Sequence, residues 1–255
     1  MNRRKLENKP LVEAIFEIRW KLKTKGQFQL DTHFQLLLAR ISNELLESDY
    51  SKYMELETAQ IPSGIIGQVV QHQFQNDSDK WPLIQIGPGI LTINDTKKYH
   101  WEDFCKRVVV AVDMLYKAHP NTKELEIESL MLRYVDAVEY DPVNEDAYEF
   151  LADKLKVSIK LPEALFEDGR VNKKPEFYKS EQFFSSNKPH GVVRLGLATG
   201  LIKENPAIIW ETGLRSTDKL PDMPGDFKEW LNQAHDLVND WFFKMINGEL
   251  EGKFK

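Results

Sequence analysis

The pattern of hydrophobic and polar positions predicts alternating strands and helices along the chain. Residues 10–20 alternate with a period of two, which is typical of a strand with one buried face, made by Val12, Ala14, Phe16, Ile18 and Trp20. Apolar residues then recur at helical spacing over residues 34–46, and Asp31 or Thr32 can cap that helix. The chain therefore opens with a strand followed by a helix.

The next segments complete a β-α-β-β-α order. Residues 65–74 and 81–94 predict two strands, and Gly87-Pro88-Gly89 interrupts the second with a sequence typical of a tight turn. Residues 101–117 predict an amphipathic helix with Phe104 and Cys105 in its apolar stripe.

The same order returns after residue 120. The expected elements are a strand over 124–140, a helix over 145–156, strands over 192–202 and 207–215, and a helix from Asp226, its N-cap, to about residue 247. Residues 163–179 have no clear periodicity and predict a polar loop. We expect an α+β fold of two pseudo-repeated β-α-β-β-α halves, residues 1–120 and 121–255, with a mainly antiparallel sheet packed as one body, because such a half cannot bury both sheet faces alone.

The amino-acid composition limits the classes of protein to which the chain can belong. The 255 residues are 42% hydrophobic, which is enough for a core, and no apolar run approaches the ~18 residues of a membrane span. One cysteine and a start without an apolar leader fit the cytoplasm. A net charge of −6 argues against a nucleic-acid-coating protein, although the basic cluster Lys21–Lys25 keeps nucleic-acid binding as a third interpretation.

Local catalytic and metal-binding motifs are missing from the sequence. The six histidines are scattered, without the paired spacing that zinc sites usually show. No Gly-x-Ser-x-Gly elbow occurs, and Cys105 is best explained as core packing. We therefore assign no catalytic residue, no metal ligand and no cofactor.

Charged residues inside the predicted strands are the main candidates for ligand binding: Glu17, Arg19, Glu126, Glu128, Arg133, Arg194 and Arg215. In one interpretation they form salt-bridged pairs on a solvent-facing sheet. In the other they line a cavity that holds a phosphorylated ligand with Mg²⁺, as in triphosphate-tunnel enzymes. The spacing Glu13-x-x-x-Glu17-x-Arg19 departs from the Glu-x-Glu-x-Lys strand of those enzymes.

The final predicted helix carries more aromatic residues than one buried face needs. Trp241, Phe242 and Phe243 are consecutive, and consecutive helical side chains diverge by ~100°. Together with Trp230 they are candidates for an interface with a protein partner or a second copy of the chain.

Several segments resemble a family of sporadically distributed prokaryotic proteins of similar length that have no established activity. The matching segments are residues 10–20, 81–89, 132–139 and 237–245. The resemblance covers nearly the whole chain and implies no site residues. Patchy occurrence is typical of accessory or host-defence proteins.

The leading functional hypothesis is a non-enzymatic cytoplasmic binding or interaction protein, an accessory of host defence or of a toxin–antitoxin system. The alternative is a phosphate- or nucleotide-handling enzyme that uses the charged strand residues and Mg²⁺. Neither hypothesis expects a membrane.

Overall fold

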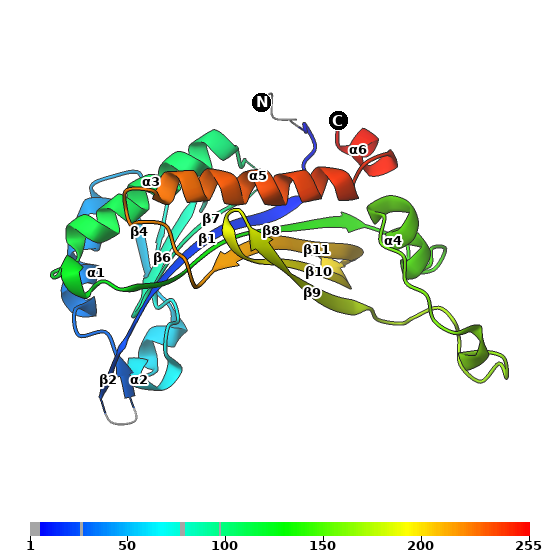
Figure 1. The fold of residues 1–255 in the computed structure, drawn as a ribbon, viewed down its shortest axis with the longest axis horizontal. Coiled ribbons are helices and arrows are strands. Elements are labelled where there is room, and N and C mark those ends of the chain that lie inside the picture. Colours follow the sequence, from blue (N-terminus) through cyan, green and yellow to red (C-terminus); the bar gives the residue numbers. More distant parts are fainter. Residues whose placement is uncertain (1–5, 26–27, 77–79, 97) are drawn as a thin grey trace.

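A single large sheet with helices on one face forms the body of the protein (Figure 1). The computed structural model describes residues 6–25, 28–76, 80–96 and 98–255. Nine strands are arranged in the order β4-β5-β6-β7-β1-β8-β11-β10-β9, and all neighbouring strands are antiparallel. The expected α+β class with a mainly antiparallel sheet is confirmed.

The bounds of the elements are as follows. The sheet strands are β1 (Leu11–Trp20), β4 (Lys52–Glu55), β5 (His72–Gln75), β6 (Leu83–Gly87), β7 (Ile90–Asp95), β8 (Ile127–Glu139), β9 (Lys179–Asn187), β10 (His190–Ile202) and β11 (Asn205–Ser216), and β2 (Lys23–Lys25) and β3 (Phe28–Leu30) form a separate ribbon. The helices are α1 (Phe34–Leu46), α2 (Ser63–Ile66), α3 (Trp101–Ala118), α4 (Ala147–Leu155), α5 (Phe227–Met245) and α6 (Glu249–Phe254), with short 3₁₀ turns η1 (Glu57–Gln60), η2 (Thr122–Glu124) and η3 (Glu163–Leu165).

Two hydrophobic clusters lie on the helix-covered face of the sheet. The first cluster joins strand residues such as Phe16 and Leu132 to α1, α3 and α5. The second cluster joins Val138 and Trp210 to α4 and α6 at the other end of the sheet. Alternate residues of β1 and β8 supply the first cluster because these two strands pair at the centre of the sheet, with Phe16 opposite Leu132.

Most predicted elements form within a few residues of their expected bounds, but β2, β3, β4 and α6 were not predicted, and three further differences occur. Val12 is 42% exposed, because a register shift between Leu11 and Glu13 turns Leu11 to the buried face instead. Most of residues 65–74 is not strand, since α2 precedes a left-handed Gly67 and only β5 pairs. The segment after residue 179 was not expected to form a strand, yet β9 forms the sheet edge there.

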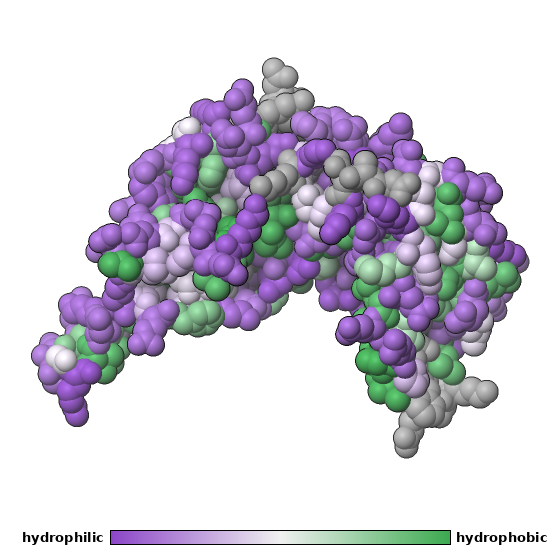
Figure 2. All heavy atoms as spheres, turned by 180° about the vertical axis from the view of Figure 1, so that it is seen from behind, coloured by the Kyte–Doolittle hydropathy of each residue, from purple (hydrophilic) through white to green (hydrophobic). Residues whose placement is uncertain are grey.

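The sheet face opposite α3 and α5 carries the polar strand residues, several of which, such as Glu17 and Thr92, are nevertheless buried. Seen from behind, the molecule is hollowed on this side (Figure 2). Among the described residues, no helix combines the length and the apolar character needed to cross a membrane. A site can lie on this hollowed face of the sheet or on the helix-covered face.

Candidate functional site

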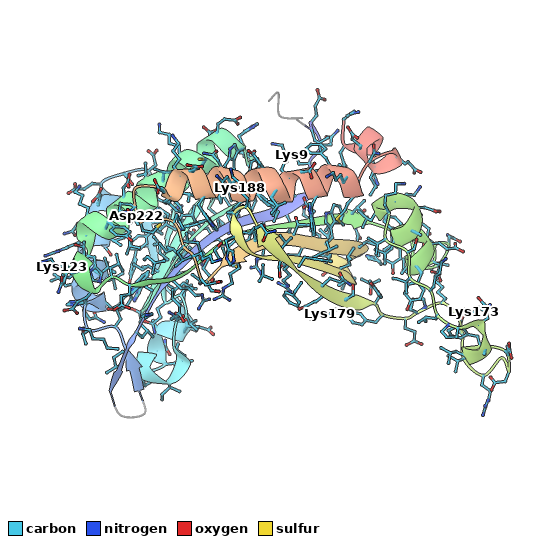
Figure 3. The ribbon with its side chains drawn as sticks, in the orientation of Figure 1. Lys9, Lys123, Lys173, Lys179, Lys188 and Asp222 are labelled. Carbon is cyan, nitrogen blue, oxygen red and sulfur yellow. The ribbon has the colours of Figure 1, made fainter. Side chains whose placement is uncertain are left out.

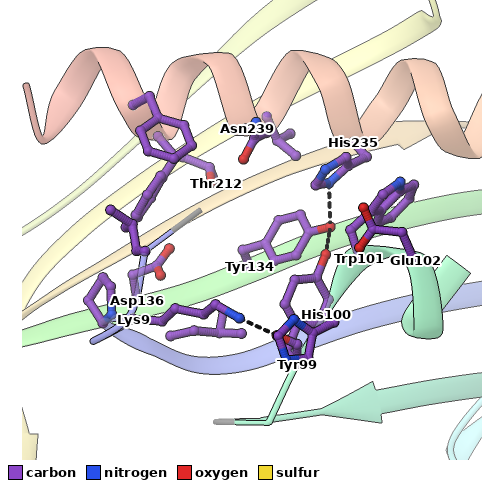
Figure 4. Close-up of a pocket in the computed structure, with 16 residues that line it drawn as sticks. Lys9, Tyr99, His100, Trp101, Glu102, Tyr134, Asp136, Thr212, His235 and Asn239 are labelled. Atoms are coloured by element: carbon purple, nitrogen blue, oxygen red, sulfur yellow. Dashed lines mark hydrogen bonds between the residues drawn. The ribbon is translucent and has the colours of Figure 1, made fainter. Parts of the chain in front are cut away.

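A cavity of about 120 Å³ lies beneath α5, where the two hydrophobic clusters meet (Figure 4). Its walls come from parts of the chain that are distant in sequence. The N-terminal segment before β1 provides Leu6 and Lys9, the start of α3 provides Trp101 and Glu102, and the strands and α5 close the remaining sides. No short motif could have revealed such a site.

One face of α5 forms a wall of the cavity. Its lining residues recur at intervals of three and four, as neighbours on one helix face do: His235, Val238, Asn239, Phe242 and Phe243. Two of the aromatic residues that the sequence marked for an interface are thus turned partly towards this cavity.

The central strands form the floor. Tyr134 and Asp136 come from β8, and Thr212 comes from β11. Thr212 lies opposite Tyr134 in the register, and Trp210 lies opposite Asp136, so all four side chains are on the helix-covered face. Polar groups therefore interrupt a row of buried apolar positions between the two clusters.

Two polar atoms of the cavity wall are buried without a hydrogen-bond partner. They are Asp136 Oδ2 and Thr212 Oγ1, on residues that are only 3% and 1% exposed. The indole Nε1 of the neighbouring Trp210 is buried without a partner as well. Each such group is costly to bury, and native proteins keep few of them. A molecule in the cavity could supply the missing partners.

Burial changes the charge of Asp136. Desolvation raises the pKa of its carboxyl from 3.8 to about 8. At neutral pH the carboxyl is therefore mostly protonated in the unliganded protein, and it can both donate and accept a hydrogen bond.

A chain of hydrogen bonds fixes the opposite wall (Figure 4). The Tyr99 and Tyr134 hydroxyls are 2.8 Å apart, and the Tyr134 hydroxyl lies 2.9 Å from His235 Nδ1. The His235 ring stacks on Trp101 with 3.7 Å between the ring centroids. Burial raises the pKa of Tyr134 well above its usual value, so its hydroxyl stays protonated and able to donate. These contacts hold the aromatic walls in place.

The charged strand residues predicted from the sequence lie elsewhere, and none of them lines the cavity. Glu17 and Arg19 of β1 pair with each other, with 2.6 Å between Arg19 Nε and Glu17 Oε1. Arg19 Nη1 also donates to the Gln68 carbonyl at 2.9 Å, and Gln68 Nε2 donates to Glu128 at 2.7 Å. Glu126 pairs with Lys21 at an exposed position.

The remaining predicted arginines are paired on the far half of the sheet. Arg194 contacts both Glu211 and Glu181, and Arg133 Nη1 lies 3.5 Å from Glu211. Arg215 Nη2 donates to Ser129 Oγ at 3.2 Å. Five of the seven candidates have oppositely charged partners, and Glu128 and Arg215 contact the neutral groups of Gln68 and Ser129. The arrangement resembles a largely salt-bridged sheet face.

The aromatic candidates on α5 have partners within the chain. Trp230 is 5% exposed, and its indole donates to Ser216 Oγ at 2.9 Å, so it has little surface to offer a partner. Trp241, Phe242 and Phe243 are half-buried. Trp241 packs edge-on against Phe184 of β9, 5.4 Å between centroids.

The basic clusters are also paired where the structure describes them. Lys21 and Lys23 contact Glu126 and Glu124, and Lys23 begins β2 near one end of the molecule (Figure 1). Lys173 contacts Glu163 at the opposite end (Figure 3). The side chain of Lys25 and residues 1–5 lie outside the described parts of the chain. This arrangement favours a solvated surface over a continuous nucleic-acid patch.

Among the described residues, the geometry supports neither a metal site nor a reactive cysteine. Within the described ranges, no group of three or more His, Cys, Asp or Glu side chains is placed to hold a metal ion. Cys105 is buried in the apolar stripe of α3, as its position in the sequence predicted.

Comparison with models of known protein families and with curated proteins finds no match. The geometry of this chain, above all the cavity beneath α5, is therefore what indicates a function.

Proposed function

We propose that the protein is a non-enzymatic cytoplasmic binding protein that holds a small molecule in the cavity beneath α5. The observation that carries this proposal is the pair of buried, unpartnered atoms Asp136 Oδ2 and Thr212 Oγ1 in an otherwise largely apolar enclosure. Binding sites for small molecules are typically mostly apolar, with a few placed polar groups.

The size of the cavity limits the ligand. An apolar cavity of roughly 150 Å³ accommodates benzene, so about 120 Å³ suits a molecule of about five to eight heavy atoms. A five-atom ligand that binds with Kd of about 1 mM gains about 0.8 kcal/mol per atom, which is within the range of small fragments.

The test uses isobutanol as a neutral probe of this size. Titration is followed by the indole N–H signals of Trp101 and Trp210 in NMR spectra, assigned with single Trp→Phe variants. We expect millimolar binding to the natural sequence and measurable but weaker binding to Thr212→Val, which keeps the side-chain volume and removes the hydroxyl. Thr212→Leu fills part of the cavity and should abolish the response while circular dichroism shows a folded protein. Equal responses of both variants, or no response of the natural sequence, would overturn the proposal.

A protein partner is a second candidate for what the chain binds, either another protein of a host-defence or toxin–antitoxin system or a second copy. β9 favours this candidate because it is a sheet edge on which Phe183 and Phe184 are 63% and 45% exposed. Edge strands with exposed apolar residues are prone to pair with other strands. If Phe183→Lys lowers the mass measured by analytical ultracentrifugation, β9 is the contact between copies; an unchanged mass removes self-association through β9.

We also propose that residues 1–120 and 121–255 are pseudo-repeats. The strand order supports this: outward from the centre, β1 is followed by β7, β6 and β5, while β8 is followed by β11, β10 and β9. Each half ends in a long helix, α3 or α5, on the same sheet face. The alternative function, a phosphate-handling enzyme with Mg²⁺, has less support because its expected arginines are already paired with glutamates or other polar groups.

A further inference from the structure

We propose that the ligand of the cavity is a small organic cation whose protonated nitrogen pairs with the Asp136 carboxylate. This inference rests on the proposed function and names the chemical class of its ligand. It follows from the charges, the aromatic walls and the unpartnered atoms of the same cavity.

Another buried acid in this fold, Asp95, has partners that Asp136 Oδ2 lacks. Asp95 and Asp136 are both 3% exposed. Asp95 has a cation, with Arg107 Nη2 3.0 Å from its Oδ2, and it accepts a hydrogen bond from the Thr96 amide. Asp136 Oδ2 has no partner. Without such partners the Asp136 carboxyl stays neutral by holding its proton, and a cationic ligand at Oδ2 allows it to ionise.

The other titratable groups around the cavity leave the position beside Asp136 open to a cation. Lys9 directs its ammonium to the Tyr99 carbonyl, and His235 Nδ1 faces the Tyr134 hydroxyl. His100 and Glu102 line the side formed by the start of α3. Desolvation raises the pKa of Asp136, as expected for a buried carboxyl whose Oδ2 has no hydrogen-bond partner.

The walls suit the rest of such a ligand. Trp101, Phe242 and Phe243 present aromatic rings to the cavity, and aromatic faces attract cations as well as apolar groups. Thr212 Oγ1 can accept a second N–H from the ligand. A primary or secondary amine on a short branched hydrocarbon body therefore satisfies the charge, both unpartnered atoms and the apolar surface.

The test compares three molecules of nearly the same shape: isobutylamine, isobutanol and isobutyrate. Their binding is measured by NMR titration at pH 8 with the Trp101 and Trp210 indole signals. We expect isobutylamine to bind at least tenfold more tightly than isobutanol and isobutyrate to bind least. Asp136→Asn should remove the preference for the amine, so that isobutylamine and isobutanol bind with similar affinities. Asp95→Asn is the matched control and should keep the preference.

A second readout separates a direct role of Asp136 from a structural one. Because the carboxyl must lose its proton to pair with the amine, isobutylamine binding should tighten about tenfold from pH 6 to pH 7 in the natural sequence. Asp136→Asn should flatten this dependence. If isobutanol binds and isobutylamine binds no more tightly than it, the cation proposal is overturned and the cavity remains a ligand site. If none of the three probes binds, both proposals are overturned.

Discussion

At the scale of single residues, Asp136 couples the stability of the fold to pH. Its carboxyl has a pKa of about 8 in the folded protein and an ordinary value of 3.8. The folded state therefore holds this proton more tightly than the unfolded state between these values. Stability from this group is fully present below about pH 4 and is lost as pH rises towards 8.

Replacing Asp136 with Asn should remove this loss. Relative to the natural sequence, Asp136→Asn should become more stable by up to about 1.4 kcal/mol for each pH unit between about 5 and 7, and the difference should level off above pH 8. Urea unfolding at several pH values without ligand measures it. Parallel stability profiles of the two proteins would show that the Asp136 carboxyl ionises at the same pH in both states. Asp95→Asn serves as the paired-acid control.

The sequence contained a signal for this residue. Alternate positions of β8 are buried and mostly apolar: Leu130, Leu132, Tyr134, Asp136 and Val138. An acid in such a row is unusual, as is Thr212 between Trp210 and Leu214 on β11. The charged candidates predicted from the sequence lie on the other sheet face, where charge is ordinary because solvent and salt bridges satisfy it.

At the scale of elements, the helix starts differ in how their N-caps work. Asp146 caps α4 with its side chain, which accepts hydrogen bonds from the Tyr148 and Glu149 amides at 2.7 and 3.3 Å. Asp226 occupies the N-cap of α5 but makes no side-chain capping bond, contrary to the sequence prediction. The two residues therefore form a natural pair for comparison.

We expect Asp146→Ala to destabilise the protein by about 1 kcal/mol, since it leaves helix amides without an acceptor. Asp226→Ala should change stability by less than about 0.5 kcal/mol, because no capping bond is lost. Chemical denaturation of both variants under the same conditions measures the difference. A loss at position 226 as large as at position 146 would contradict this account of the caps.

Elements with one buried face were predictable, and elements without one were not. The two-residue turn at Pro88-Gly89 joins β6 and β7 as its sequence indicated, with Gly89 at a φ of +73° that suits glycine. β9 escaped prediction because it is an edge strand that is largely exposed on both faces, so it lacks alternation. The short α2 was hidden in an apolar run that also fits a strand.

At the scale of the whole molecule, the site exists only because the two halves share one sheet. β1 and β8 pair at the centre of the sheet, and α5 lies above them. Leu11 of β1 and Tyr134 of β8 line the cavity together with residues of α5. The lining residues run from Leu6 to Phe243. Such a constellation has no local spacing, so the sequence predicted the sheet and helices that build the cavity but not the cavity itself.

The most direct test of the ligand site is native mass spectrometry of the untagged chain, gently purified from the cells that normally produce it. We expect the natural sequence to carry a small-molecule increment above the chain mass of 29.7 kDa. Thr212→Leu, with the cavity partly filled, should have the bare chain mass. Equal masses for Thr212→Leu and the natural sequence would contradict the proposal that the cavity beneath α5 holds the ligand.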